Sequence, residues 1–224
     1  MTYKEELIRL LVEADALRFG EFTLKSGRKS PYFLNAGMLR TGRHFELLGE
    51  MYADCVMQTI GGNFDVLFGP AYKGITLANS AACALYRKYG LEKEICFNRK
   101  EAKDHGEGGS LVGAPLYDGA RLIIIEDVTT SGASVREVMP LIRAAADVRV
   151  SDMYTMLDRM EAGVDGKYAI DEIKREFSVT VHPMVTVREV IDFLRNREIG
   201  GRVVLDDEKR ARMEKYMERY CVKR

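Results

Sequence analysis

The sequence predicts an α/β fold, a parallel sheet flanked by helices, and two observations lead to that prediction. From residue 66 to residue 151, short apolar runs alternate with longer segments whose apolar residues recur at the spacing of a helix. This β-α-β alternation is typical of a parallel sheet with helices on both faces. The 224 residues suffice for one sizeable domain with a small appendage, and no linker or internal repeat divides them.

Capping signals and apolar periodicity locate the helices. Thr2 and Glu5 form a capping box at the start of the chain, and Thr186 and Glu189 form a second one. Further helices are expected at 41–60, 75–86, 133–145 and 170–177, and a charged amphipathic helix from residue 206 onward. Pro140 should kink or shorten the helix that contains it. For the tail helix, a solvated surface is favoured over a subunit contact.

Short runs rich in β-branched and aromatic residues predict the strands. Two of them, 22–25 and 32–35, flank a Ser-Gly-Arg-Lys-Ser-Pro turn near the N-terminus. The other expected strands are 66–68, 95–98, 122–126, 148–157 and 179–181. Residues 99–113 contain few apolar side chains and several glycines, which predicts a mobile loop.

Charge and cysteine content exclude several classes of protein. The 34 basic and 34 acidic side chains give no basic excess, which disfavours a nucleic-acid partner. No apolar run is long enough for a membrane span, and the N-terminus lacks the apolar core of a signal peptide. Cys55 and Cys83 lie on apolar helix faces and are expected in the core. No cysteine or histidine spacing suggests a metal site, so a reducing cytoplasm fits best.

The most informative stretch runs from Leu122 to Ser134. A buried apolar strand ends in two adjacent acids, Glu126 and Asp127, and a short Thr/Ser/Gly loop leads into a helix. Backbone N–H groups and hydroxyls of such a loop suit a phosphate at the carboxyl edge of a sheet. The carboxylates suit ribose hydroxyls, directly or through a hard cation. An ordinary strand with a capped turn is the alternative, but adjacent like charges repel and bring the fold no evident benefit.

Two further segments suit anions. The strand-to-helix loop 69–74 contains two glycines and Lys73, although alone it is equally well interpreted as a plain turn with an exposed lysine. Two such loops at neighbouring strand ends favour a ligand with phosphates at both ends. The loop 99–113 contains Lys100, Lys103 and His105, which suit a lid that closes over a polyanion, although charged loops are usually only solvated.

Lys25, Phe33 and Arg159 are candidates for a pocket that holds a planar base. Phe33 offers a flat apolar face, and the two cations can pair with ring oxygens or a carboxylate. Each has a simpler interpretation, with Phe33 in the core and Lys25 and Arg159 as surface charges.

Residues 125–132, Ile-Glu-Asp-Val-Thr-Thr-Ser-Gly, resemble the phosphoribosyl pyrophosphate (PRPP) motif of type I phosphoribosyltransferases. Segments 22–28, 69–74 and 98–109 resemble the orotate phosphoribosyltransferase family in particular. The resemblance extends from about residue 15 to about residue 195, and the long lid segment is its most specific part. It implies the type I phosphoribosyltransferase fold in one domain, residues 1–224. About residues 1–40 and C-terminal elements would form a small N-terminal hood, and 99–113 a mobile catalytic loop.

The resemblance implies Mg²⁺-dependent transfer of ribose 5-phosphate from PRPP to orotate, which yields orotidine 5′-monophosphate and pyrophosphate in pyrimidine synthesis. The implied PRPP ligands are Lys25, Tyr72, Lys73, Arg99, Lys100, Lys103, His105, Glu126, Asp127, Val128, Thr129, Thr130, Ser131, Gly132, Ala133 and Ser134. The residues expected to act in catalysis are Lys100, Lys103, His105 and Asp127. The implied orotate ligands are Phe33, Leu34, Thr130 and Arg159. Mg²⁺ is expected to be held mainly by PRPP and water, and a homodimer is implied because the family's lid serves the neighbouring subunit.

Two departures from the family pattern and two alternative functions bear on this expectation. Leu34 stands where family members often carry a second aromatic, and Glu126 where bacterial members often have aspartate, which keeps the charge. The alternatives are a transferase for a purine or another base and a non-catalytic PRPP-sensing regulator. The base-pocket residues argue against the first, and the intact lid against the second. No function is assigned to the tail beyond about residue 200.

Overall fold

The computed structural model describes residues 2–24, 27–103, 109–129, 132–162 and 166–222. Their main sheet has six strands in the order β5-β4-β3-β6-β7-β8, and every neighbouring pair is parallel except β4 with β5. The strands are β3 (Val66–Gly69), β4 (Glu94–Lys103), β5 (Gly109–Gly113), β6 (Arg121–Thr129), β7 (Arg149–Asp158) and β8 (Thr180–Thr186). The predicted α/β fold with a parallel sheet is confirmed.

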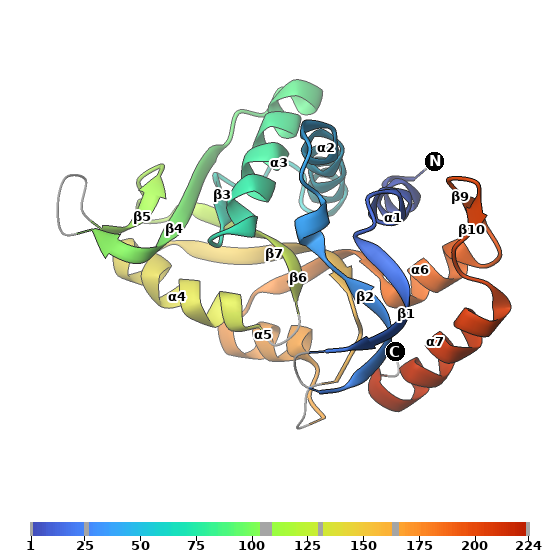
Figure 1. Ribbon diagram of the computed structural model, residues 1–224. Helices are drawn as coiled ribbons and strands as arrows, with labels where there is room; N and C mark the ends of the chain where they lie inside the picture. Colours follow the sequence, from blue (N-terminus) through green and yellow to red (C-terminus); the bar gives the residue numbers. More distant parts are fainter. Residues whose placement is uncertain (1, 25–26, 104–108, 130–131, 163–165, 223–224) are drawn as a thin grey trace.

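Helices cover both faces of this sheet (Figure 1). They are α2 (Gly42–Thr59) and α3 (Lys73–Tyr89) on one face, and α4 (Ala133–Ala145) and α5 (Ala169–Phe177) on the other. In β6, Ile123 and Ile125 belong to the core beneath α2 and α3, whereas Leu122 and Ile124 belong to the core beneath α4 and α5. Because both faces are buried, the strand is apolar at successive positions rather than at alternate ones.

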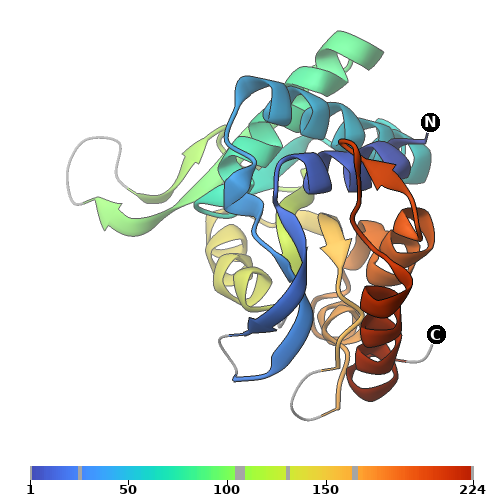
Figure 2. The ribbon, with the colours of Figure 1, turned by 45° about the vertical axis from the view of Figure 1, so that its right-hand side comes forward.

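A smaller group of elements lies beside the sheet and contains both ends of the chain (Figures 1 and 2). It consists of α1 (Tyr3–Glu13), the antiparallel hairpin of β1 (Leu17–Thr23) and β2 (Lys29–Leu34), the short helix η1 (Ala36–Met38), α6 (Val187–Leu194), β9 (Glu198–Ile199), β10 (Arg202–Val203) and α7 (Asp207–Tyr220). Both predicted capping boxes are present, at Thr2 and at Thr186.

The expectation that all of 99–113 forms a loop is wrong. Residues 99–103 prolong β4 and 109–113 form β5, and the two strands pair at Asn98 with Leu111 and at Lys103 with Gly109. A ladder satisfies the backbone polar groups without requiring apolar side chains, so a polar sequence can form it. The paired strands project from the body of the molecule as an arm in Figures 1 and 2.

Three local expectations also change. Cys55 is buried as predicted, but Cys83 is exposed because it lies on the outward side of α3. The solvated interpretation of the tail helix is wrong at Met213 and Tyr216, which are buried where α7 packs on the main core. α4 keeps its predicted length, so Pro140, whose side chain is exposed, does not shorten the helix; the alternative expectation, a kink at Pro140, stays a prediction.

Gly49 of α2 faces α3 at a contact that leaves no room for a side chain. A Cβ at this position would lie 2.4 Å from the carbonyl oxygen of Ser80. Gly49→Ala should force the helices apart and lower the free energy of unfolding by about 1–3 kcal/mol, measured by denaturant titration. The control is Gly42→Ala in the same helix, where an added Cβ meets nothing within 4 Å. Equal stability of the Gly49→Ala variant and the wild type would contradict this packing.

Candidate active site

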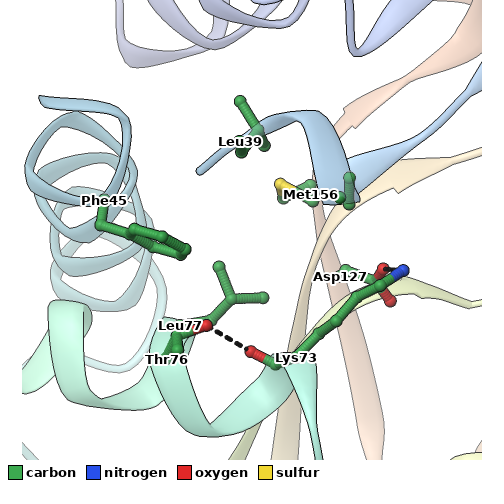
Figure 3. Close-up of a pocket in the computed structure, with 9 residues that line it drawn as sticks. Leu39, Phe45, Lys73, Thr76, Leu77, Asp127 and Met156 are labelled. Carbon is green, nitrogen blue, oxygen red and sulfur yellow. Dashed lines mark hydrogen bonds and ion pairs between the residues drawn. The ribbon is translucent and has the colours of Figure 1, made fainter. Parts of the chain in front are cut away.

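The two predicted anion-binding loops meet at the carboxyl edge of the sheet. Lys73 begins α3 after β3, and its Nζ lies 2.7 Å from Oδ2 of Asp127 near the end of β6. Both side chains line a hollow that is closed by Leu39, Phe45 and Met156, among others (Figure 3). The Lys73 side chain is 58% exposed. The Asp127 side chain is 15% exposed, so the pair is open to water only on the side of the lysine, and an incoming anion can reach Lys73 from that side.

The loop 69–74 is shaped by two glycines and a buried asparagine. A Cβ on Gly69 would lie 2.3 Å from the carbonyl oxygen of Gly74, and one on Gly74 would lie 2.8 Å from the carbonyl oxygen of Ile125. Asn98 of β4 is 2% exposed and accepts a hydrogen bond from the Ala71 N–H at 2.8 Å. The start of α3 is therefore fixed against the sheet, and Tyr72, 71% exposed, stands beside it.

Glu126 and Asp127 are neighbours in β6 but occupy different environments. Glu126 is buried, and its carboxylate accepts hydrogen bonds from the Asp127 N–H and the Ser134 hydroxyl. Burial raises the pKa of Glu126 to about 7, the two hydrogen bonds oppose the rise, and the charge of Asp127 adds to it. Asp127 instead faces the hollow and accepts the Val128 N–H. Of the two acids, Asp127 is therefore the one placed to meet a ligand.

The N-terminus of α4 is suited to an anion. Its N-cap is Gly132 in the left-handed region at φ +71°, and no side chain of the described residues caps the helix, so its first N–H groups have no intrahelical partner. Thr129, just before this turn, is 8% exposed, and its Oγ1 is buried without a partner among the described residues. Thr130 and Ser131, the rest of the predicted phosphate loop, lie outside the described residues.

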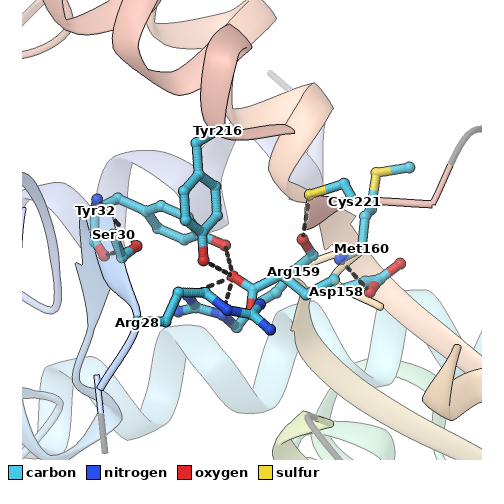
Figure 4. A network of polar contacts seen from close by, with 9 residues as sticks. Arg28, Ser30, Tyr32, Asp158, Arg159, Met160, Tyr216 and Cys221 are labelled. Atoms are coloured by element: carbon cyan, nitrogen blue, oxygen red, sulfur yellow. Dashed lines mark hydrogen bonds and ion pairs between the residues drawn. The ribbon is translucent and has the colours of Figure 1, made fainter. Parts of the chain in front are cut away.

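Arg159, predicted for the base pocket, is buried and held in one orientation. Its Nε and Nη2 donate to Oε1 of Glu161 at 3.0 and 2.6 Å. Its guanidinium lies over the ring of Tyr32, 4.4 Å from the centroid. Figure 4 shows these groups between the β1–β2 hairpin and α7. The interpretation of Arg159 as a surface charge is wrong, because its side chain is 9% exposed.

The aromatic ring that contacts Arg159 belongs to Tyr32 and not to Phe33, the residue predicted for the base pocket. Successive residues of a strand point to opposite faces, so Phe33 turns away from Tyr32 and stacks on Phe22 at 5.5 Å. Leu34 is partly buried and packs against the main core. Lys25 lies outside the described residues.

The structure describes the predicted lid only in part. Nζ of Lys100 in β4 lies 2.5 Å from Oε1 of Glu137 on α4. The Lys100 side chain is 35% exposed, and the Glu137 side chain is 49% exposed. Nη1 of Arg99 is buried without a partner among the described residues. The side chain of Lys103 and all of His105 lie outside what the structure describes.

Sequence reasoning missed three residues that hold the site together. Asn98 had a signal, since a polar residue that ends a buried apolar run needs a partner. Glu161 follows Arg159 by two residues, a spacing that favours pairing. Tyr216 lies 55 residues further on, and no local pattern connects it to Glu161.

The comparisons with known proteins agree with this arrangement. A model of the phosphoribosyl transferase domain matches residues 38–181. Orotate phosphoribosyltransferase of Agathobacter rectalis is 50% identical over 99% of both chains, and that of Clostridium acetobutylicum is 45% identical over 99% of both. The crystal structure of orotate phosphoribosyltransferase from Francisella tularensis superposes with a TM-score of 0.83 at 29% identity, covering 97% of this chain and all of that one.

Fold, anion loops and domain match together define a phosphoribosyltransferase. With relatives at 45–50% identity over almost the whole length, the chain belongs to the orotate phosphoribosyltransferase family.

The buried Glu126 should make stability depend on pH. Its folded-state pKa lies above the ordinary value of 4.5, so the folded protein binds more protons than the unfolded chain between about pH 4 and 7. Stability should therefore fall as pH rises through this range. The glutamine of the Glu126→Gln variant cannot ionise. Between pH 5 and 8, the free energy of unfolding of the wild type should therefore fall by about 1–3 kcal/mol more than that of the variant.

The measurement is denaturant unfolding of both proteins at each pH in metal-free buffer. Glu218→Gln, at an exposed position of α7, is the control and should show no pH-dependent difference from the wild type. A constant difference between wild type and Glu126→Gln across this range would contradict the raised pKa.

Proposed function

We propose that this chain transfers the 5-phosphoribosyl group of PRPP to orotate and releases pyrophosphate, a step of pyrimidine synthesis. The observation that carries the proposal is the contact of Lys73 with Asp127, 2.7 Å apart. It brings together two strand-end loops that each suit an anion, as a substrate with phosphates at both ends requires. The family of the chain supports orotate as the acceptor.

The residues that we assign to PRPP divide between its two ends. The 5-phosphate end goes to the start of α4, with Val128, Thr129, Thr130, Ser131, Gly132, Ala133 and Ser134. The pyrophosphate end goes to Tyr72 and Lys73 and to the lid residues Arg99, Lys100, Lys103 and His105, while Lys25 reaches PRPP near the base. Asp127 lies between the two ends and suits the ribose hydroxyls. Glu126 supports PRPP binding indirectly, because its carboxylate accepts hydrogen bonds that hold Asp127 and Ser134 in place.

The chemistry follows from where the charge develops. The bond from the ribose carbon to pyrophosphate breaks, the bonding electrons stay on the leaving oxygen, and the ribose carbon becomes cation-like. A ring nitrogen of orotate supplies the electron pair for the new bond to this carbon and releases its proton to water. Lys73 and the lid cations stabilise the charge on the leaving group, and Asp127 faces the positive ribose. The carboxylate of orotate and its ring oxygens suit Arg159, whose Nη1 has no hydrogen-bond partner among the described residues. Phe33, Leu34 and Thr130 complete the proposed base site.

The donor set at the hollow fits Mg²⁺ shared with the substrate. Among the described residues, no three His, Cys, Asp or Glu side chains gather into a cage for an ion. Asp127 offers carboxylate oxygens at the hollow, and Mg²⁺ is commonly held by one or two carboxylates together with substrate phosphates and water. Mg²⁺ bound there would neutralise part of the pyrophosphate charge.

We further propose a cytoplasmic homodimer of single-domain subunits, in which about residues 1–40 and the C-terminal elements form a hood. The projection of the β4–β5 arm away from the body supports a lid that serves the neighbouring subunit. Free cysteines suit a reducing compartment. Within the described part, no helix combines the length and apolar character that crossing a bilayer needs.

The direct test is a spectrophotometric assay of orotate loss. We expect loss that requires both PRPP and Mg²⁺ and stops on addition of chelator. If the protein consumed adenine or another base and not orotate, the proposal that orotate is the acceptor would be contradicted. Binding of PRPP by folded protein without turnover would instead support the non-catalytic regulator.

The shared lid predicts complementation between two inactive variants. Lys103→Ala removes a lid cation, and Asp127→Asn impairs the chain's own PRPP loop. In a mixture of equal amounts, half of the dimers pair the two variants, and one of their two sites is intact, so about a quarter of wild-type activity should return. The measurement is turnover after subunit exchange, with heterodimers verified by native mass spectrometry. No recovery once heterodimers are present would place the lid over its own chain's site.

A further inference from the structure

The C-terminal tail is joined to the segment that carries Arg159. α7 contributes Tyr216, whose hydroxyl donates to Oε1 of Glu161 at 2.8 Å. Beyond the helix, residues 220–222 pair with 160–162 through backbone hydrogen bonds, and Sγ of Cys221 lies 3.5 Å from the carbonyl oxygen of Arg159. These tail residues lie outside the 38–181 region that the domain model matches.

Glu161 is the centre of this network, and its partners Arg28, Tyr32, Arg159 and Tyr216 are labelled in Figure 4. Its Oε1 accepts from Arg159, Tyr216 and, at 3.4 Å, the hydroxyl of Tyr32, while Oε2 pairs with Arg28 at 3.2 Å. The Glu161 side chain is only 16% exposed. A carboxylate so far removed from water needs these partners, because an unpaired buried charge is strongly unfavourable.

The network also determines how Arg159 can be used. Glu161 takes the Nε N–H and one N–H of Nη2, and Tyr32 covers the flat face, which leaves Nη1 and the second N–H of Nη2 as donors for a ligand. Burial, followed by the charge of Glu161, raises the pKa of Tyr216, so its hydroxyl stays protonated and donates. With fewer donors on Glu161, both Glu161 and Arg159 would have more than one orientation.

We propose that Tyr216 of the tail helix is a positioning residue for the base site, acting through Glu161 to hold Arg159 in the orientation that receives the carboxylated pyrimidine. The inference rests on the proposed function, in which Arg159 contacts the base. If Tyr216 acts in this way, the tail helps to select the acceptor base and has no part in PRPP binding at the other end of the site.

The test is Tyr216→Phe, assayed with orotate and PRPP varied separately. We expect KM for orotate to rise about three- to tenfold, while KM for PRPP and kcat stay within about twofold of the wild type. Tyr220→Phe is the matched control. Tyr220 lies on the same helix with its ring over Arg28, and its hydroxyl makes none of the described hydrogen bonds, so its constants should stay those of the wild type.

A double-mutant cycle distinguishes positioning from general loosening of the fold. In an Arg159→Ala background, Tyr216→Phe should change KM for orotate less than about twofold, because the residue through which it acts is gone. The same rise in both backgrounds would overturn the inference, as would an equal rise in both KM values or no change in a folded variant. If Tyr216→Phe fails to fold, Glu161→Gln replaces it with the same expected split.

The two proposals fail in distinguishable ways. Wild-type protein without orotate turnover would overturn the proposed function and this inference together. Wild-type turnover with an unaffected Tyr216→Phe variant would overturn only the role of the tail.

Discussion

α3 begins where β3 ends, and two glycines let the start of the helix lie against the backbone of both β3 and β6. Neither Gly69 nor Gly74 could carry a Cβ without meeting backbone atoms within 3 Å. This contact places Lys73 beside Asp127 and brings both anion loops to one hollow. Asn98 secures the same junction from β4 through the Ala71 N–H. The chemistry proposed for the site therefore depends on a backbone contact that contains no reactive group.

Two carboxylates, the buried Glu126 and the partly buried Glu161, hold their surroundings in different ways. Glu126 has hydrogen-bond donors but no cation among its described partners, and burial raises its pKa. Glu161 is paired with Arg159 and Arg28 and receives tyrosine hydroxyls as well. Removing one partner of a buried ion pair costs more than the pair itself contributes. The hairpin, the 159–161 segment and α7 are thus held to one another at the base end.

Sequence patterns could predict the sheet and the two strand-end loops that meet at the hollow because their signals are local. The apolar run 122–125, the two acids after it and the following loop are contiguous in the sequence. The helix predicted at 41–60 from apolar spacing differs from α2 by one residue at each end. The arm was missed because backbone pairing leaves no apolar pattern. The environment of Arg159 was missed because Tyr32 lies over it from the hairpin, and because Arg28 and Tyr216 hold its partner Glu161; only the tertiary fold brings these three residues there. The assignment of Phe33 depended on which face of β2 points to Arg159, and no single-strand pattern gives that.

The two ends of the site also differ in how readily their charges can be exchanged. Lys73 and Lys100 are each paired with a carboxylate but are open to water on the side of the lysine, so a polyphosphate can reach either of them. Arg159 is buried in a network that holds its guanidinium in one orientation and leaves only part of its donors to a ligand. Exposed lysines attract any polyanion with little selectivity, whereas a fixed guanidinium rejects acceptors whose oxygens do not meet it. In the proposed function, this difference gives the phosphate-binding residues the affinity for PRPP and gives Arg159, which the tail helix supports, the choice of base.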